Sequence, residues 1–165
     1  MTRSLVSRIG RTRYGRAMPN PADSHSSSRP AASTEIVRRN MQRQKRRDTG
    51  CEMAVRRLLH AEGIRYRVDF KPLSDERFRA DIGWKTRRIA VFIDGCFWHA
   101  CPQHCTMPKR NTEWWEAKLR ANSARDQRAD AVLRSRGWAV LRFWEHEPPH
   151  EVAAAIRTHL MRRAS

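Results

Sequence analysis

Hydrophobic residues from Cys51 onward recur at three- and four-residue steps, which is the spacing of one face of an α-helix. Asp48 or Thr49 can cap such a helix at its start, and Gly63 can end it. Cys51 lies on the apolar stripe, so we expect it to pack in the core. Glu52 lies beside the stripe, where the pattern alone predicts an acid on the helix surface.

Short apolar runs and alternating patterns predict the β-strands that follow. The expected strands cover residues 64–68, 78–83, 88–93 and 138–144. One helix is expected over residues 112–136, ahead of the last strand, and another over residues 152–161. This order predicts an α/β fold in which a mixed central sheet is flanked by helices on both faces.

The helix expected after Thr112 carries two polar residues on its inward face. The positions on that face are Trp115, Leu119, Asn122, Asp126, Ala129 and Leu133. A buried carboxylate needs a partner, so Asp126 is expected to meet a cation, an imidazole or an arginine. An aspartate at the rim of the core, bonded to the backbone, is the equal alternative.

A chain of 165 residues suits one domain, with a core that starts at about Cys51. The sequence carries 34 basic and 17 acidic residues, which gives a formal charge of +17. Such an excess predicts a polyanionic partner, most often nucleic acid, and a merely solvated basic surface is the alternative. No apolar run is long enough to span a bilayer, so we expect no membrane partner.

The N-terminal part of the chain differs from the rest in composition. Residues 1–33 hold arginine, serine and proline and little that can pack, which predicts a disordered basic tail ahead of a domain over residues 34–165. The scarcity of acids as far as Asp23 superficially resembles a transit peptide, and a true start at Met18 is another interpretation. The basic run at residues 38–47 is either a phosphate-contacting arm or a solvated segment.

Residues 90–105, AVFIDGCFWHACPQHC, gather three of the four cysteines and two of the seven histidines. The candidate metal ligands are Cys96, Cys101, His104 and Cys105. His146 follows the last strand, which can lie beside the strand that ends at Cys96, so it is a candidate closing ligand from far along the chain. Four thiolate and imidazole ligands form tetrahedral zinc sites, and a closed set is structural because it leaves no open position. Reduced cysteines packed in the core are the alternative interpretation.

A second candidate site lies where two of the expected strands end. Asp81 is unusual in a strand interior, and beside Ile93 and Asp94 it can hold Mg²⁺, which takes one or two carboxylates plus waters and a phosphate. His99 can act as a general base on water, although an isolated histidine is more often structural. Four aromatic residues flank this region and either stack on bases or pack as ordinary core: Phe97, Trp98, Trp114 and Trp115.

Seven segments form a long and ordered set of motifs across residues 34–147. In chain order they read NMQRQKRRDTGCE, RYRV, RADI, DGCFWHACPQH, NTEWWEAKL, NSARD and GWAVLRFWEHE. This set resembles the very-short-patch-repair (Vsr) family of DNA mismatch endonucleases. The resemblance implies a fold similar to restriction endonucleases of the PD-(D/E)xK type, with a mixed sheet between helices and a structural zinc site.

The same resemblance implies a Mg²⁺-dependent endonuclease that nicks the T-containing strand just 5′ of a T:G mispair. Such mispairs arise by deamination of 5-methylcytosine at the sites of a cytosine-5 DNA methyltransferase, and the nick initiates very short patch repair. The implied partners are mismatched double-stranded DNA, mismatch-repair proteins and that methyltransferase system. We expect a monomer in a bacterial cytoplasm, associated with the nucleoid. The alternatives are a non-catalytic, zinc-stabilised DNA-binding protein and a nuclease acting on matched DNA.

Site roles carried over from the family fall on residues of four kinds. The implied catalytic residues are Asp81, His99, Glu52 and Asp126, the last orienting an active-site histidine. The implied Mg²⁺ ligands are Asp81 and the backbone carbonyl of Ile93. The implied Zn²⁺ ligands are Cys96, Cys101, His104 and His146. The implied DNA-intercalating residues are Phe97, Trp98 and Trp115. Two departures from the family remain open. Cys105 is an extra thiol that can replace His104, and Asp94 stands where some members carry a histidine, so it can add a second acid.

Overall fold

A computed structural model describes Arg39 and residues 47–163. The predicted tail at residues 1–33 and nearly all of the basic run lie outside the described residues. The elements of the described part are α2 (Gly50–Ala61), β1 (Arg67–Phe70), β2 (Ala80–Trp84), β3 (Ile89–Asp94), α3 (Thr112–Ser135), β4 (Ala139–Trp144) and α4 (Pro149–Arg162). The helices and the last two strands match the prediction closely, because their periodic patterns are long or strongly apolar.

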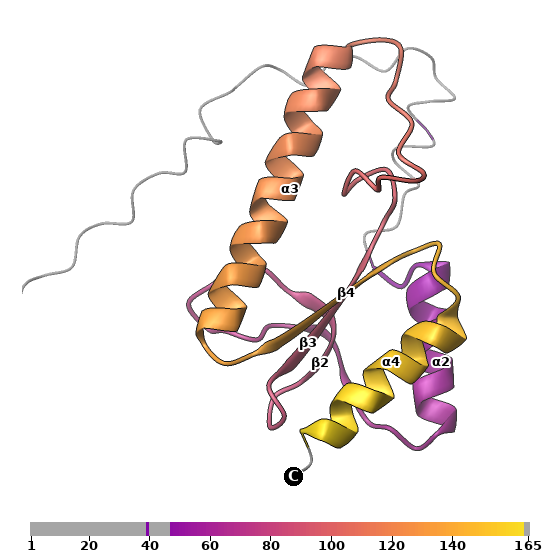
Figure 1. Cartoon of the computed structure of the whole chain (residues 1–165), viewed down its shortest axis with the longest axis vertical. Helices are drawn as coiled ribbons and strands as arrows, with labels where there is room; N and C mark the ends of the chain where they lie inside the picture. Colours follow the sequence, from indigo (N-terminus) through magenta and orange to yellow (C-terminus); the bar gives the residue numbers. More distant parts are fainter. Residues whose placement is uncertain (1–38, 40–46, 164–165) are drawn as a thin grey trace, which may run out of the picture.

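The four strands form one sheet in the order β1-β2-β3-β4 (Figure 1). The β1–β2 and β2–β3 pairs are antiparallel, and β3 and β4 are parallel. A parallel pair needs a long crossover connection, and α3 supplies it. The prediction of a mixed sheet flanked by helices is therefore confirmed.

Helices cover both faces of this sheet (Figure 1). On one face, α2 and α4 pack against each other and against the strands through residues such as Leu59, Val91 and Ile156, all of which are fully buried or nearly so. On the other face, Leu133 of α3 and Trp138 pack over β1, β2 and β3. The two cores fix the strands from both sides, so the strand ends are held in defined places.

Gly83 in β2 is required by close packing against the neighbouring strand. A Cβ atom at this position would collide with the aromatic ring of Phe70 in β1. The ring itself is buried and lies against Trp138, with the ring centroids 5.7 Å apart. Any side chain at residue 83 would therefore push Phe70 out of the core.

The structure corrects three details of the predicted elements, and one of them is that the second strand covers Ala80–Trp84 rather than residues 78–83. The first strand begins at Arg67 rather than at residue 64, although Ile64 and Tyr66 still pack against the core. The buried face of α2 is also rotated from the predicted stripe, because Glu52 is buried while Leu58 is 37% exposed. None of the helices in the described part of the chain has the length and apolar content needed to cross a membrane.

Candidate active site and metal centre

The parallel pairing of β3 and β4 brings together two segments that are far apart in sequence. Asp94, at the end of β3, lies opposite Trp144, at the end of β4. The backbone N–H of Glu145 donates to the carbonyl of Asp94 at 2.9 Å, and the N–H of Cys96 donates to Glu145 Oε1 at 2.6 Å. The loop after β3 and the turn after β4 are thereby joined, and both carry candidate ligands.

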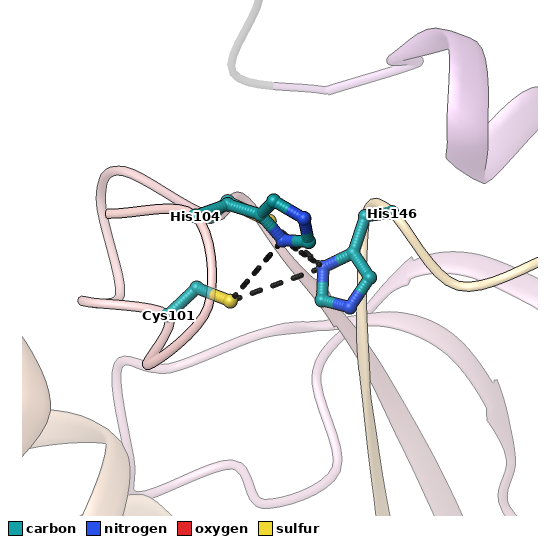
Figure 2. A group of neighbouring side chains, drawn as sticks. Cys101, His104 and His146 are labelled. Carbon is teal, nitrogen blue, oxygen red and sulfur yellow. Dashed lines mark hydrogen bonds between the residues drawn. The ribbon is translucent and has the colours of Figure 1, made fainter. Parts of the chain in front are cut away.

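Four thiol and imidazole side chains converge at this junction. Their ligand atoms, on Cys96, Cys101, His104 and His146, all lie within 4.8 Å of one another. Figure 2 shows Cys101 and His104 reaching from the loop toward His146, which comes from the end of β4. His146 was predicted to lie near the loop cysteines although it is far from them in sequence, and the fold brings it there.

The separations inside this Cys/His group fit a tetrahedral metal ion. Cys96 Sγ lies 3.1 Å from His146 Nδ1 and 4.0 Å from His104 Nδ1, and Cys101 Sγ lies 3.8 Å from His104 Nδ1. Ligand atoms about 2.0 to 2.3 Å from a tetrahedral zinc are themselves roughly 3.3 to 3.8 Å apart. The donor set, two sulfurs and two imidazole nitrogens, is also one that zinc prefers.

Two further observations bear on the Cys/His group. Burial, with the neighbouring Cys101 thiol and the charge of Glu145, raises the pKa of Cys96 to about 11. A bound cation is therefore needed to convert this thiol to the thiolate that ligates a metal. Cys105 lies outside the group, with its Sγ 3.8 Å from the carbonyl oxygen of Phe97, so its geometry does not favour the replacement of His104.

His99 is held by an acid of helix α3, which follows later in the chain. Its Nδ1 donates to Asp126 Oδ2 of α3 at 2.6 Å, and Asp94 Oδ1 lies 3.7 Å from the same nitrogen. One helical turn before Asp126, the side-chain amide of Asn122 donates to the carbonyl of Trp98 at 2.8 Å. The two polar residues on the inward face of α3 therefore fix the loop segment that carries His99. The aspartate bonded only to the backbone is excluded as an interpretation of Asp126.

The charges around His99 favour its protonated form. Burial by itself lowers the pKa of His99, but the hydrogen bond to Asp126 and the charges of Asp94 and Asp126 outweigh burial. The pKa therefore lies above its ordinary value. Because Asp126 engages Nδ1, Nε2 is the ring nitrogen left to exchange a proton with water or substrate.

Asp81 occupies the place of a backbone partner at the end of the sheet. Its Oδ2 accepts a hydrogen bond from the N–H of Ile93 at 2.7 Å. The N–H and C=O of one strand residue point to the same side of the strand, so the carbonyl of Ile93 faces the side on which Asp81 lies. The two predicted magnesium ligands, one carboxylate and one backbone oxygen, are therefore neighbours in the fold.

The environment of Asp81 is strongly perturbed. Burial raises the pKa of Asp81 to about 6, opposed by the hydrogen bond from Ile93 and assisted by the negative charges of Glu52 and Asp94. A buried carboxylate with acidic neighbours is stabilised by a cation, and hard oxygen ligands suit Mg²⁺. The residues present therefore fit a divalent cation at this position.

Glu52 is buried rather than on the helix surface, where the pattern alone predicted it, and it is only 4% exposed. Its Oε1 accepts from the hydroxyl of Thr49, and its Oε2 accepts from the N–H of Asp48. Thr49 caps α2 in return by accepting from the N–H of Glu52. This reciprocal pairing at the first helical turn is the physical reason that an acid is tolerated inside. It also holds the charge of Glu52 close enough to act on Asp81.

Sequence reasoning missed Arg142, which lies at the centre of the charged residues. It extends from β4 and binds both oxygens of Asp94, at 2.7 and 2.6 Å. Asp94 is only 7% exposed, and this pairing leaves it as a counterion of arginine rather than a free metal ligand. The signal was present in the sequence, because an arginine inside the apolar strand WAVLRFW must have buried partners.

The aromatic residues form one cluster beside the Cys/His group. Phe97 lies 5.2 Å from Trp98 and 5.2 Å from Trp115, measured between ring centroids, and Trp114 lies 4.8 Å from Trp115. Phe97 and Trp98 are half-buried, whereas Trp115 is buried. Trp114 is half-buried as well, so Phe97, Trp98 and Trp114 present surface to a partner in this conformation, and Trp115 does not.

Comparison with known proteins bears directly on this arrangement. The sequence profile of a family described as DNA mismatch endonuclease Vsr matches residues 33–107. A Lentzea aerocolonigenes protein named type II nicking enzyme V.NaeI is 46% identical over 120 residues, which are 72% of each chain. The DNA mismatch endonuclease Vsr of Escherichia coli strain K12 is 36% identical over 110 residues, 65% of this chain and 67% of that protein.

A third relative, type II nicking enzyme V.XorIIP of Xanthomonas oryzae pv. oryzae, is 40% identical over 118 residues and is covered over 83% of its length. The family match and these relatives, together with the α/β fold and its histidine–carboxylate pair, define the class of the protein, which is a DNA endonuclease. The chain belongs to the Vsr family.

Proposed function

We propose that the protein nicks the T-containing strand of double-stranded DNA on the 5′ side of a T:G mispair and so initiates very short patch repair. The observation that carries the proposal is the pairing of His99 with Asp126, at 2.6 Å, in a chain of the Vsr family whose half-buried Asp81 lies among other acids. A histidine fixed by a carboxylate is suited to remove a proton from water. The T:G substrate follows from the family resemblance.

In the proposed mechanism His99 acts as the general base. Its Nε2 accepts the proton of the attacking water, while Asp126 holds Nδ1 and stabilises the imidazolium that results. Glu52 and Asp81 contribute negative charge to the site, and Glu52 acts on Asp81 through its charge. These roles match the catalytic set of Asp81, His99, Glu52 and Asp126 implied by the family.

We assign the two metal ions of this proposal to separate residues. Mg²⁺ would be held by Asp81 and by the carbonyl of Ile93, with a geometry of the PD-(D/E)xK type in which a backbone oxygen stands for the second acid. When bound, it would stabilise the charge that develops on the scissile phosphate. Zn²⁺ would be held by the Cys/His group, namely Cys96, Cys101, His104 and His146. A closed four-ligand site of this kind serves structure, since it joins the ends of β3 and β4.

DNA recognition in this proposal uses the aromatic cluster. Phe97, Trp98 and Trp115 would insert beside the mispair, and unstacking of a mismatched step costs less than that of a matched one. Trp115 is buried against Phe97 and Trp98, so its insertion requires the cluster to open. The proposed partners are mismatch-repair proteins and a cytosine-5 methyltransferase system. We propose that the protein acts as a monomer in the cytoplasm and that residues 34–165 form the DNA-cutting domain.

The decisive assay uses a labelled duplex with a central T:G pair and Mg²⁺. We expect wild type to nick the T strand, and Asp81→Asn to bind the duplex without cutting it, because asparagine keeps an acceptor for Ile93 but loses the charge. Equal cutting by Asp81→Asn would contradict the assigned mechanism. Cutting of a T:A duplex at the same rate would favour a nuclease for matched DNA. Absence of cutting by wild type on all mismatches would favour a DNA-binding protein without catalysis.

A separate measurement tests the zinc ligands. We expect protein purified without chelator to hold about one zinc per chain, and His146→Ala to lose it. Cys105→Ala is the matched control, since its sulfur lies outside the Cys/His group and removal should leave the metal content unchanged. Loss of zinc in Cys105→Ala, or full zinc in His146→Ala, would show that the ligand set is different.

A further inference from the structure

Arg142 makes more ionic contacts than the family-derived roles explain. Besides Asp94, its guanidinium reaches two acids of α3 that lie one helical turn apart. Its Nε donates to Asp130 Oδ1 at 3.1 Å, and its Nη2 lies 3.6 Å from Asp126 Oδ1. The remaining oxygen of Asp126 is the one that accepts from His99. Arg142 therefore contacts the same carboxylate, that of Asp126, to which His99 is hydrogen-bonded.

The position of Arg142 in the fold makes this contact rigid. Its residue pairs with Phe92 across the parallel β3–β4 ladder, and the guanidinium carbon lies 4.5 Å from the centroid of the Phe92 ring. The planar guanidinium can bind several carboxylates at fixed angles, which a lysine ammonium cannot do. The edge strand β4 is thus linked to α3 through one side chain.

Asp94 gives Arg142 a second effect on the histidine. Asp94 Oδ1 lies 3.7 Å from His99 Nδ1, and Asp126 Oδ2 lies 2.6 Å from the same nitrogen. Asp126 accepts the hydrogen bond of this nitrogen, while Asp94 is near enough to act on it through its charge, and Arg142 binds both oxygens of Asp94. Without the arginine, Asp94 would be a buried anion with His99 as its nearest cationic partner in the described part of the chain.

We propose that Arg142 is a positioning residue, which orients Asp126 and restrains Asp94 so that His99 donates Nδ1–H to Asp126 alone and turns Nε2 toward the substrate. This inference deepens the proposed function and rests on the assignment of His99 as general base. It explains why an arginine is accepted within a strand of the central sheet. It also explains why Asp94 belongs to Arg142 and not to the magnesium site.

The test must separate orientation from simple charge neutralisation. Arg142→Leu alone leaves the Asp94 charge buried and unpaired, so it can lose activity by misfolding. The double variant Asp94→Asn/Arg142→Leu removes both charges and so leaves no unpaired charge at Asp94, but it cannot orient Asp126. Arg142→Lys keeps one positive charge and loses the planar fork. Arg157→Leu is the matched control, because Arg157 also pairs with both oxygens of an acid, Glu62.

We expect the single-turnover nicking rate of the double variant to fall at least about tenfold, since misplacement of a catalytic group by an ångström can cost about a hundredfold. Its half-saturating protein concentration should stay within about threefold, because no DNA-contacting group has changed. Arg142→Lys should recover part of the rate, and Arg157→Leu should nick within about twofold of wild type. Wild-type rate in the double variant would overturn the proposal, because neutralisation of Asp94 would then be sufficient.

A spectroscopic readout keeps the inference testable without any nicking assay. In the full-length ¹⁵N-labelled protein, the Nδ1–H resonance of His99 is identified by its loss in His99→Gln. We expect it to be downfield and slow to exchange in wild type and in Arg157→Leu, and broadened or absent in the double variant. An unchanged resonance in the double variant would overturn the positioning role. If wild type failed to nick any mismatch while this signature behaved as expected, the proposed function would fail and the positioning role would stand.

Discussion

Two regions of the protein differ in the side chains that they bury. One is the core beneath α2 and α4, and the other is the site at the ends of β3 and β4. The core consists of buried aliphatic and aromatic side chains, with Leu59, Ile82 and Ile156 fully inaccessible to solvent. At the strand ends, buried or half-buried charges replace them, and Arg142 contacts both Asp94 and Asp126. Buried charge is costly unless paired, so its concentration in one region points to function rather than stability. Mutations should therefore separate the two properties.

Removal of the proposed zinc should have the largest effect. It should lower stability and nicking activity together, because the Cys/His group joins the ends of β3 and β4. Structural zinc sites contribute on the order of 10 kcal/mol to folding in small domains. We expect chelation to lower Tm sharply and to abolish nicking, with both restored by added Zn²⁺ but not by Mg²⁺. Thermal unfolding and nicking on the same sample check this. An unchanged Tm after metal is stripped would exclude a structural role.

His99→Gln should affect the site and leave the core intact. Loss of a general base costs about 10²- to 10⁴-fold in rate, whereas glutamine can still donate to Asp126 and maintain the local contacts. We expect a large loss of the single-turnover nicking rate with little change in Tm. Arg157→Leu, a substitution away from the site, is again the control, and its nicking rate and Tm should stay close to those of wild type. A rate within a few-fold of wild type would remove His99 from the mechanism.

Leu59→Ala should show the reverse behaviour. Leu59 is fully buried between α2 and the sheet, and such truncations cost about 2 to 5 kcal/mol. We expect Tm and the denaturation midpoint to fall while the nicking rate, assayed well below Tm, changes little. Leu58→Ala, on the same helix but 37% exposed, is the matched control. A nicking defect as large as that of His99→Gln would mean that core and site are mechanically coupled.

Thr49→Ala should give the smallest effect of the set, and it probes a residue that both caps α2 and binds Glu52. Loss of a threonine N-cap costs about 1 kcal/mol, and here it also frees one oxygen of Glu52. We expect a small fall in Tm, with a moderate change in nicking because Glu52 acts on Asp81. Thr49→Ser, which keeps the cap, should behave as wild type. A large stability loss without any change in nicking would separate Glu52 from the site.

Comparison of prediction with structure shows where local pattern is sufficient. The helices, the strand at residues 138–144 and the inward face of α3 with Asn122 and Asp126 were predicted correctly, because each depends on near neighbours in sequence. The convergence of His146 on the loop cysteines also followed from the expectation that two strands end side by side. Prediction was wrong for the buried face of α2, where Glu52 and Arg56 replace the expected Cys51 and Leu58.

The sequence by itself determined the α/β class, the mixed sheet, the ligands available for a metal and the family. The family resemblance already implied a histidine as the partner of Asp126, and the structure identifies it as His99, 27 positions away in sequence. Only the tertiary structure decided the partner of Asp94, which is Arg142, 48 positions away. The physical reason is that periodicity is imposed by backbone geometry within a few residues, whereas the partner of a buried charge is whichever group the packing of sheet and helix brings within reach.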